Sequence, residues 1–294
     1  FEQGLVPVAY GNLLLKFRAH RVIVASGIVE QPLVFPGNDL VGVMLPDAVR
    51  RLINGFSIKP AERAVVLTVD DRGLRAAADL EAAGVEIVRI VDFRAVGSPA
   101  IEVQGKGGKV AQVSIDGNHV KADLVVMCGS PQPNYKLLAQ AGARVEYDEG
   151  RGVFVPTDLP ANVEAVGAVT GDVGEPAVPS PILDHRGDKC FVCICEDQTT
   201  KDLKYAIAEG FDSIELSKRY TTVTMGPCQG RLCHTNSIRV YAKTTGLDEN
   251  TIGTTTARPP YTPISMGLLA GPPQEPRKRT SLHHRHKDIG GKMM

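Results

Sequence analysis

The stretch AVVLTVDDRGLRAAADLEAAGVEIVRIVDF, residues 64–93, decides the fold class. It predicts an apolar strand over 64–69, a break at 70–73, an Ala-rich helix that stops at Gly84, and a second strand that ends near Asp92. Two consecutive strands joined by a helix pair in parallel. The sequence therefore predicts an α/β protein that contains a parallel sheet.

The turn inside this unit argues against a nucleotide site there. A pyrophosphate cradle uses the pattern GxGxxG, whose glycines let backbone N–H groups approach the anion. The turn here reads TVDDRG, residues 68–73, and keeps Gly73 alone. Asp70 and Asp71 would place negative charge where phosphates bind, and Asp92, at the position of a ribose-binding acid, carries little weight by itself. We therefore expect a degenerate dinucleotide fold with a structural role.

Three further stretches repeat the theme of an apolar strand followed by glycine: RVIVASG (21–27), ADLVVMCGSPQPN (122–134) and NVEAVGAVTGDVG (162–174). PDAVRRLINGF (46–56) reads as a short amphipathic helix, and 101–122 as antiparallel strands. A strand, an inserted βαβ unit and a return to strands is the order of flavoproteins with two dinucleotide folds. The candidate dinucleotide-binding residues of such an outer fold are Ser26, Gly27, Gly167 and Gly171. Glycines at strand ends serve as simple turns just as often.

Five of the six cysteines fall within residues 190–233. Cys193 and Cys195 form a CxC pair, and Cys228 and Cys233 form a CxxxxC pair. Four thiolates can bind a [2Fe–2S] cluster or a structural zinc ion. Zinc sites favour CxxC, so the shorter CxC spacing favours iron and sulfide. Buried thiols acting as small hydrophobic side chains are the alternative, and disulfides are not expected without a secretory signal.

The segment around the cysteines reads as helical. Thr199 and Thr200 can cap the helix TKDLKYAIAEG, and Pro227 is well placed to start a helix that runs through CQGRLCHTNSIRVYAK, residues 228–243. Cys228 would then lie at a helix N-terminus, where unpaired N–H groups and the helix dipole favour a thiolate and an anionic cluster.

Composition bounds the class of protein. The chain has 294 residues, 43% of them hydrophobic, and 33 basic side chains balance 33 acidic ones. A net charge of zero gives no electrostatic argument for nucleic acid or an anionic membrane as partner. No apolar run approaches the roughly 20 residues that span a bilayer, so the cytoplasm is the default location. Because the sequence begins at Phe1, inside an ordered-looking segment, we expect a fragment of a longer protein.

With these features in place, the chain resembles the alpha subunits of heterotetrameric sarcosine oxidases and of related opine and proline dehydrogenases. The resemblance rests on CICEDQTTKDLKYAIAEGFDSIELSKRYTTVTMGPCQGRLC (193–233), TTARPPYTPISMGLLAG (255–271) and LHHRHKDIGGKMM (282–294).

The resemblance implies an α/β architecture: a two-dinucleotide-fold, glutathione-reductase-like FAD/NAD(P)-binding domain followed by a small helical cysteine-rich domain. The implied parts are the dinucleotide-binding domain at 1–184 with a second dinucleotide-fold unit inserted at 63–122, a bacterioferritin-associated-ferredoxin-like [2Fe–2S]-type domain at 185–250, a proline-rich linker at 251–281, and the start of an aminomethyltransferase-like domain at 282–294. The Pro, Gly and charged residues of 176–189 read as a connection between the first two parts.

The resemblance also implies a division of labour. In such complexes a beta subunit carries the flavin (FAD or FMN) that oxidises sarcosine to glycine, and smaller subunits complete the assembly. The alpha subunit holds a dinucleotide, and a domain beyond this chain binds the tetrahydrofolate that accepts the one-carbon unit. We expect no catalytic residue in this chain, an NAD site, a permitted [2Fe–2S] cluster, and no activity of the chain alone.

Flavin-binding relatives read Gly-Asp after the last strand, whereas this chain reads Gly167-Ala168, and Asp172 comes too late to align. This difference favours NAD over FAD. Two other functions stay open: an alpha subunit of an opine, proline or hydroxyproline dehydrogenase that relays electrons through [2Fe–2S], and a non-catalytic scaffold that holds cofactors.

Overall fold

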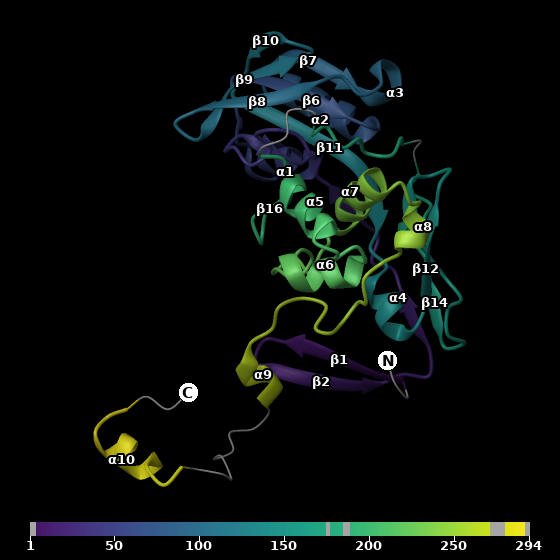
Figure 1. Ribbon diagram of the computed structural model, residues 1–294, viewed down its shortest axis with the longest axis vertical. Coiled ribbons are helices and arrows are strands. Elements are labelled where there is room, and N and C mark those ends of the chain that lie inside the picture. The colour runs from purple at the N-terminus through teal and green to yellow at the C-terminus, as the bar shows by residue number, and fades with distance from the viewer. Residues whose placement is uncertain (1–3, 175–176, 185–188, 271–279, 292–294) are drawn as a thin grey trace.

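The computed structural model describes residues 4–174, 177–184, 189–270 and 280–291 (Figure 1). The elements of the first half are β1 (Leu5–Tyr10), β2 (Leu13–Arg18), β3 (Val22–Val24), β4 (Ile28–Gln31), β5 (Val43–Met44), α1 (Pro46–Phe56), β6 (Arg63–Thr68), α2 (Asp71–Ala82), β7 (Glu86–Asp92), α3 (Phe93–Val96), β8 (Ile101–Lys106), β9 (Lys109–Ile115), β10 (Asn118–Lys121) and β11 (Leu124–Pro133). Those of the second half are α4 (Lys136–Ala141), β12 (Arg144–Asp148), β13 (Val153–Thr157), β14 (Val163–Ala165), the 3-10 helix η2 (Gly167–Thr170), β15 (Phe191–Cys193), β16 (Gln198–Thr199), α5 (Thr200–Ala208), α6 (Ile214–Thr221), α7 (His234–Thr245), α8 (Glu249–Ile252), α9 (Met266–Ala270) and α10 (His283–Asp288).

The predicted βαβ unit is β6, α2 and β7, and its two strands are parallel. β11 pairs in parallel with the other side of β6, and β4 closes that edge in the antiparallel sense, in the order β4-β11-β6-β7. Asp70 caps α2 by accepting a hydrogen bond from the Arg72 backbone N–H, and Gly84, with φ +79°, follows its last turn. The predicted antiparallel strands are the sheet β8-β9-β10.

Two hydrophobic clusters lie around this sheet. One joins α1 and α2 to the sheet through Val49, Leu80 and Val126, and the other joins β8 and β9 to it through Val103 and Val113 among others. Figure 1 shows the resulting lobe at the top of the molecule, with β8, β9 and β10 beside the main sheet. Burial on both faces explains why β6 and β11 are nearly continuous apolar runs.

The strand predicted at 21–27 is shorter than expected. β3 pairs in parallel with β14, and these two strands form a separate two-stranded sheet packed on α4 through Val24, Leu138 and Val163. The hairpin β12–β13 lies alongside it (Figure 1). The chain is thus a mixed α/β protein.

The cysteine-rich part consists of the hairpin β15–β16 and the helices α5, α6 and α7. Residues 234–241 of α7 are all buried. They share one hydrophobic cluster with side chains of the first part, which include Val34, Tyr135, Tyr147 and Phe154. The cysteine-rich part is therefore packed into the remainder of the chain along α7.

The expected connection at 176–189 is not free in its described part. The Leu183 N–H donates to the Val34 carbonyl at 2.9 Å, and Ser180 Oγ accepts from the Ser130 N–H at 2.7 Å. Asp184 is 7% exposed and forms ion pairs with Lys204 and Lys243. Residues 177–184 are thus docked, because their apolar and polar groups find partners on both parts.

The proline-rich segment 251–281 contains the end of α8 and the short α9, and 271–279 lie outside the described residues. A further domain that begins at 282 stays a prediction. Within the described ranges, no helix has the length and apolar character required to cross a membrane.

Candidate functional site

The four candidate metal ligands come from two loops that meet above α7. Cys193 ends β15, and Cys195 lies in the turn before β16. Cys228 lies in the irregular segment after α6, and Cys233 is the N-cap residue of α7. Cys193 and Cys233 are buried, Cys228 is half-buried and Cys195 is exposed.

The thiols interact in a chain. Cys233 forms hydrogen bonds with Cys193 and with Cys228, and Cys228 also bonds with Cys195. The four thiols therefore lie in pairwise contact, and their role as metal ligands stays a prediction.

Backbone donors add to these contacts. The N–H groups of Glu196 and Thr224 point to Cys193, and those of Leu232 and Gly230 point to Cys228. The hydrogen bond from Cys233, together with the backbone donors, lowers the pKa of Cys193 to about 6 and also lowers that of Cys228. The lowered pKa of both sulfurs favours the thiolate, which is the form that binds metals.

The helix predicted to start at Pro227 is wrong in its first turn. α7 begins only at His234, because Gln229 and Gly230 take positive φ values of 53° and 74° and cannot continue a helix. Cys228 therefore does not lie at a helix N-terminus. Cys233 does, as the N-cap of α7.

No group of three or more His, Cys, Asp or Glu side chains is arranged to hold one metal ion, within the residues that the structure describes. All four cysteines are among the described residues. Their side chains are therefore not arranged around one point, as a tetrahedral zinc site would require. A [2Fe–2S] cluster requires a different arrangement of ligands, because each of its two irons binds two of the four thiolates. The donor set of four sulfurs with backbone N–H donors fits such a cluster in chemistry.

Three of the four candidate dinucleotide residues, Ser26, Gly27 and Gly167, lie at the carboxyl end of the β3–β14 ladder. Ser26 and Gly27 follow β3, and Gly167 follows β14, whose neighbour Val166 donates its N–H to the Val24 carbonyl at 3.1 Å. Gly27 and Gly167 have positive φ, and a Cβ at either would meet nothing within 4 Å. Backbone that is open in this way can be approached closely by a ligand.

Gly171 has a different role. It follows η2 with φ 95°, and a Cβ there would lie 2.5 Å from Cγ1 of Val155. The residue is needed for packing of the turn against β13, and the structure does not place it on the open edge beside Gly27.

Asn134 is a residue of this edge that sequence reasoning missed. Its carbonyl accepts from Ser26 Oγ at 2.8 Å, and its N–H donates to the Gly27 carbonyl at 2.9 Å. Its side chain donates a hydrogen bond to the hydroxyl of Tyr261. The guanidinium carbon of Arg231 lies over the Tyr261 ring, 4.1 Å from the ring centroid. Arg231 lies between Cys228 and Cys233, so a short series of contacts joins the strand edge to the cysteine loop.

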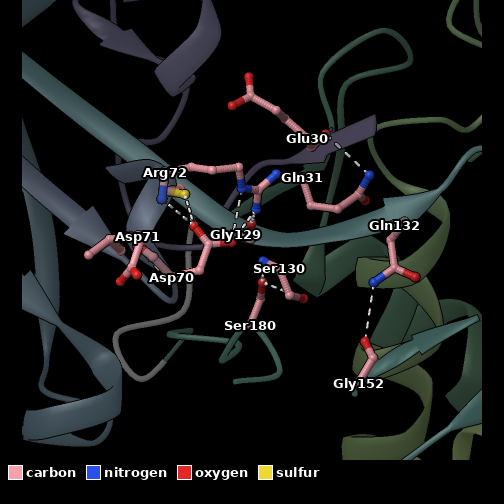
Figure 2. A network of polar contacts seen from close by, with 12 residues as sticks. Glu30, Gln31, Asp70, Asp71, Arg72, Gly129, Ser130, Gln132, Gly152 and Ser180 are labelled. Carbon is pink, nitrogen blue, oxygen red and sulfur yellow. Dashed lines mark hydrogen bonds and ion pairs between the residues drawn. The ribbon is translucent and has the colours of Figure 1, made fainter. Parts of the chain in front are cut away.

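The second dinucleotide-fold unit is closed by its own side chains. Figure 2 shows Arg72 folded over Asp70 and directed at the Gly129 carbonyl, which Nη2 reaches at 3.0 Å. Asp70 is 1% exposed and also accepts a hydrogen bond from Cys128 at 3.2 Å. These contacts occupy the turn where a pyrophosphate would lie.

The two other acids of the unit are also paired. Arg94 bonds with Asp92 at 2.9 Å and with Asp71 at 2.6 Å. The carboxylate at the end of β7 is thus held by an arginine of the same chain, which agrees with the structural role expected of this unit.

The amino-acid sequence of the chain is similar to those of known proteins. The family model "Sarcosine oxidase A3 domain" matches residues 187–272, the segment that contains the four cysteines. The chain is 30% identical to "Sarcosine oxidase subunit alpha" of Rhizobium meliloti (strain 1021), over 94% of this chain and 34% of that subunit. It is 29% identical to the subunit of the same name from Corynebacterium sp. (strain P-1), over 94% of this chain and 36% of that one.

A solved structure shares the fold. The crystal structure of L-proline dehydrogenase from P. horikoshii superposes with a TM-score of 0.77 at 23% identity, over 90% of this chain and 61% of that chain. The chain is homologous to subunits of oxidoreductases. More narrowly, it is a homologue of the sarcosine oxidase alpha subunit, as predicted, and it spans about a third of the length of those relatives.

Proposed function

We propose that this chain is the part of a sarcosine oxidase-type alpha subunit that holds a dinucleotide and a two-iron cluster side by side. The observation that carries the proposal is the group of four cysteines joined by thiol hydrogen bonds and surrounded by backbone N–H donors. Cys193, Cys195, Cys228 and Cys233 would hold the cluster, which supplies one-electron transfer when bound. The four N–H donors would stabilise its negative charge.

The dinucleotide would bind at the edge of an outer, glutathione-reductase-like dinucleotide fold to which β3 and β14 belong. Ser26, Gly27 and Gly167 would line it directly, while Gly171 supports the adjoining turn. NAD is the better ligand, because Ala168 stands where flavin-binding relatives have an acid. The second unit would stay empty, since Arg72 and Asp70 fill its turn.

The whole complex would carry out oxidative demethylation of sarcosine to glycine, with transfer of the one-carbon unit to tetrahydrofolate. The flavin (FAD or FMN) of a beta subunit would oxidise the amine in a heterotetramer, and a folate-binding domain outside this chain would accept the carbon. This chain would supply no catalytic residue and would contribute binding, orientation and electron relay. Support comes from the homology to sarcosine oxidase alpha subunits.

Anaerobic absorption spectroscopy with iron and sulfide analysis tests the cluster. We expect visible absorption with about two irons and two sulfides per chain, and loss of both in Cys228→Ser. Cys128→Ser is the control, because Cys128 is a buried thiol bonded to Asp70 and remote in sequence from the four. A colourless protein with zinc or no metal would remove the cluster from the proposal and leave NAD alone.

A second function is an alpha subunit of an opine, proline or hydroxyproline dehydrogenase, in which the cluster passes electrons to an acceptor other than oxygen. The fold shared with L-proline dehydrogenase over 90% of the chain favours it. Hydrogen peroxide formation by the complete complex separates the two, since an oxidase produces it and the dehydrogenase does not.

A further inference from the structure

A cavity of about 180 Å³ lies beside the cysteine loop. It is bounded by α4, α6, the segment 222–230 and the extended chain after α8, which runs past α6 and α4 (Figure 1). The extended chain is fastened there: the Thr256 N–H donates to Glu215 at 2.6 Å, and Gln140 donates to the Arg258 carbonyl at 3.0 Å. The lining residues are Tyr135, Lys136, Gln140, Lys218, Thr224, Met225, Gln229, His234, Thr255, Thr256, Ala257, Arg258, Pro260 and Tyr261.

The charged residues that line this cavity are all cationic: Lys136, Lys218 and Arg258. Glu215, the acid that interacts with Lys218, already accepts a hydrogen bond from the Thr256 backbone N–H. Burial, with a contribution from Arg258, lowers the pKa of Lys218, and burial lowers that of Lys136 to about 8. Three cations around one small space repel each other, so an anion within that space would lower the free energy of the arrangement.

Polar groups complete the cavity wall. Thr224 is 6% exposed, and its Oγ1 finds no hydrogen-bond partner among the described residues. The hydroxyl oxygen is shielded from solvent, so a ligand in the cavity would not contact it. His234 is not a ligand either, because its two ring nitrogens face the Tyr135 hydroxyl at 3.0 Å and the Thr255 N–H at 3.0 Å.

Size and shape restrict the ligand. The cavity is smaller than the roughly 300–1,000 Å³ of pockets that enclose whole drug-sized ligands, so it suits a head group. Lysine and arginine are the side chains that bind phosphate oxygens in proteins. Met225, Pro260 and Tyr261 add an apolar rim on which an attached organic group could pack.

We propose that this cavity binds the phosphate group of a small organic phosphate, with Lys218 and Arg258 as its ligands. Lys136 forms the wall shared with the cysteine loop, since its Nζ would lie 3.2 Å from a Cβ at Gly230. The cavity shares Thr224, whose N–H points to Cys193, and Tyr261, which bonds with Asn134, with the site described above.

Calorimetric titration of the full-length protein at constant ionic strength tests the proposal, with inorganic phosphate and phenyl phosphate as probes. We expect both to bind, phenyl phosphate at least about tenfold more tightly because of the apolar rim. Lys218→Gln and Arg258→Gln should each weaken both probes about tenfold or more. Lys121→Gln, an exposed lysine on β10, should leave both affinities unchanged.

Three outcomes would overturn the proposal. Neither probe binding in the millimolar range, or equal binding by the two variants and the control, would show that the cavity is not a phosphate site. Inorganic phosphate binding as tightly as phenyl phosphate would contradict the organic ligand and assign the site to the free ion. Iron and sulfide contents measured on the same samples report on the proposed cluster separately, so failure of one proposal is distinguishable from failure of the other.

Discussion

Gly226 is the residue that lets the two cysteine loops approach each other. A Cβ at this position would lie 2.5 Å from the Cβ of Cys195 and 2.8 Å from Oε1 of Glu196. Distances below 3.0 Å between such atoms require the backbone of one loop to move. The position of Cys195 relative to Cys228 thus depends on the absence of one methyl group.

Gly226→Ala should therefore separate the loops and lower the iron content to less than half of the wild-type value. We expect it to cost about 1–3 kcal/mol of unfolding free energy as well, the usual effect of overpacking. Gly55→Ala is the matched control, because Gly55 lies in α1 with only Arg51 Cγ near, at 3.9 Å. It should be neutral or stabilising. Iron analysis and urea unfolding give both values, and wild-type iron content in Gly226→Ala would contradict the argument.

Asp184 holds the segment 177–184 to α5 and α7 through ion pairs with Lys204 and Lys243. Burial raises the pKa of this carboxyl, but hydrogen bonds from Lys204 and Lys243 outweigh it, so the pKa lies below its ordinary value. A lowered pKa in the folded state means that the ion pairs stabilise the protein above about pH 4. This stabilisation is lost as the pH falls through the folded-state value.

Asp184→Asn should lower the unfolding free energy by about 1–3 kcal/mol at pH 7. The difference from wild type should be smaller near pH 3, because the carboxyl of the unfolded wild type is protonated there and the contribution of the ion pairs declines. Urea unfolding at both pH values measures it, with Asp39→Asn, an exposed carboxylate, as control. An equal difference at both pH values would show that charge is not the reason for the loss.

At the scale of elements, local signals predicted the βαβ unit well. Asp70 as N-cap and Gly84 as stop are visible in the sequence and act within one helical turn. The start of α7 could not be predicted in the same way, because the positive φ of Gln229 is imposed by the packing of the cysteine loop. The cysteine spacing predicted four candidate ligands, and their role as ligands stays a prediction. The Asn134–Tyr261 contact joins residues 127 positions apart and leaves no local signal.

Gly73 illustrates how an element-scale role differs from the one a motif suggests. It is the residue left from a glycine-rich turn, yet a Cβ there would lie 2.3 Å from Oγ1 of Thr68 and 3.2 Å from the Cβ of Cys128. The glycine therefore allows α2 to lie close against β6 and β11. Its function in this chain is helix–sheet packing.

Gly73→Ala should destabilise the protein by about 1–3 kcal/mol through overpacking and leave NAD affinity unchanged. Gly167→Val, at the open edge after β14, should do the reverse and weaken NAD at least about tenfold, because a side chain would enter the space of the ligand. Urea unfolding and equilibrium dialysis with NAD separate the two effects. Loss of NAD binding in Gly73→Ala, with binding kept in Gly167→Val, would indicate that NAD binds at the unit β6–α2–β7 instead.

At the scale of the whole molecule, the two parts share one interior. Buried residues of α7 bond across the boundary: Asn236 donates to the Pro32 carbonyl at 2.9 Å, and Arg239 donates to Ser130 at 3.1 Å and to the Gly152 carbonyl at 2.9 Å. Division of the chain at 184 would leave these polar groups and the apolar face of α7 in water. The cysteine-rich part is therefore not expected to have a stable core of its own.

A fragment of residues 185–250 should thus be unfolded, although residues 189–250 are folded in the chain. Its ¹H–¹⁵N NMR spectrum should show the narrow amide dispersion of an unfolded chain, whereas a chain of residues 1–250 should give a dispersed spectrum. Metal binding can supply folding free energy, so the measurement is repeated after anaerobic reconstitution with iron and sulfide. We expect no dispersed spectrum then either, because the buried Arg239 would still lack its partners Ser130 on β11 and Gly152 just before β13. A fragment that folds cooperatively, with or without the cluster, would establish the cysteine-rich part as an independent domain.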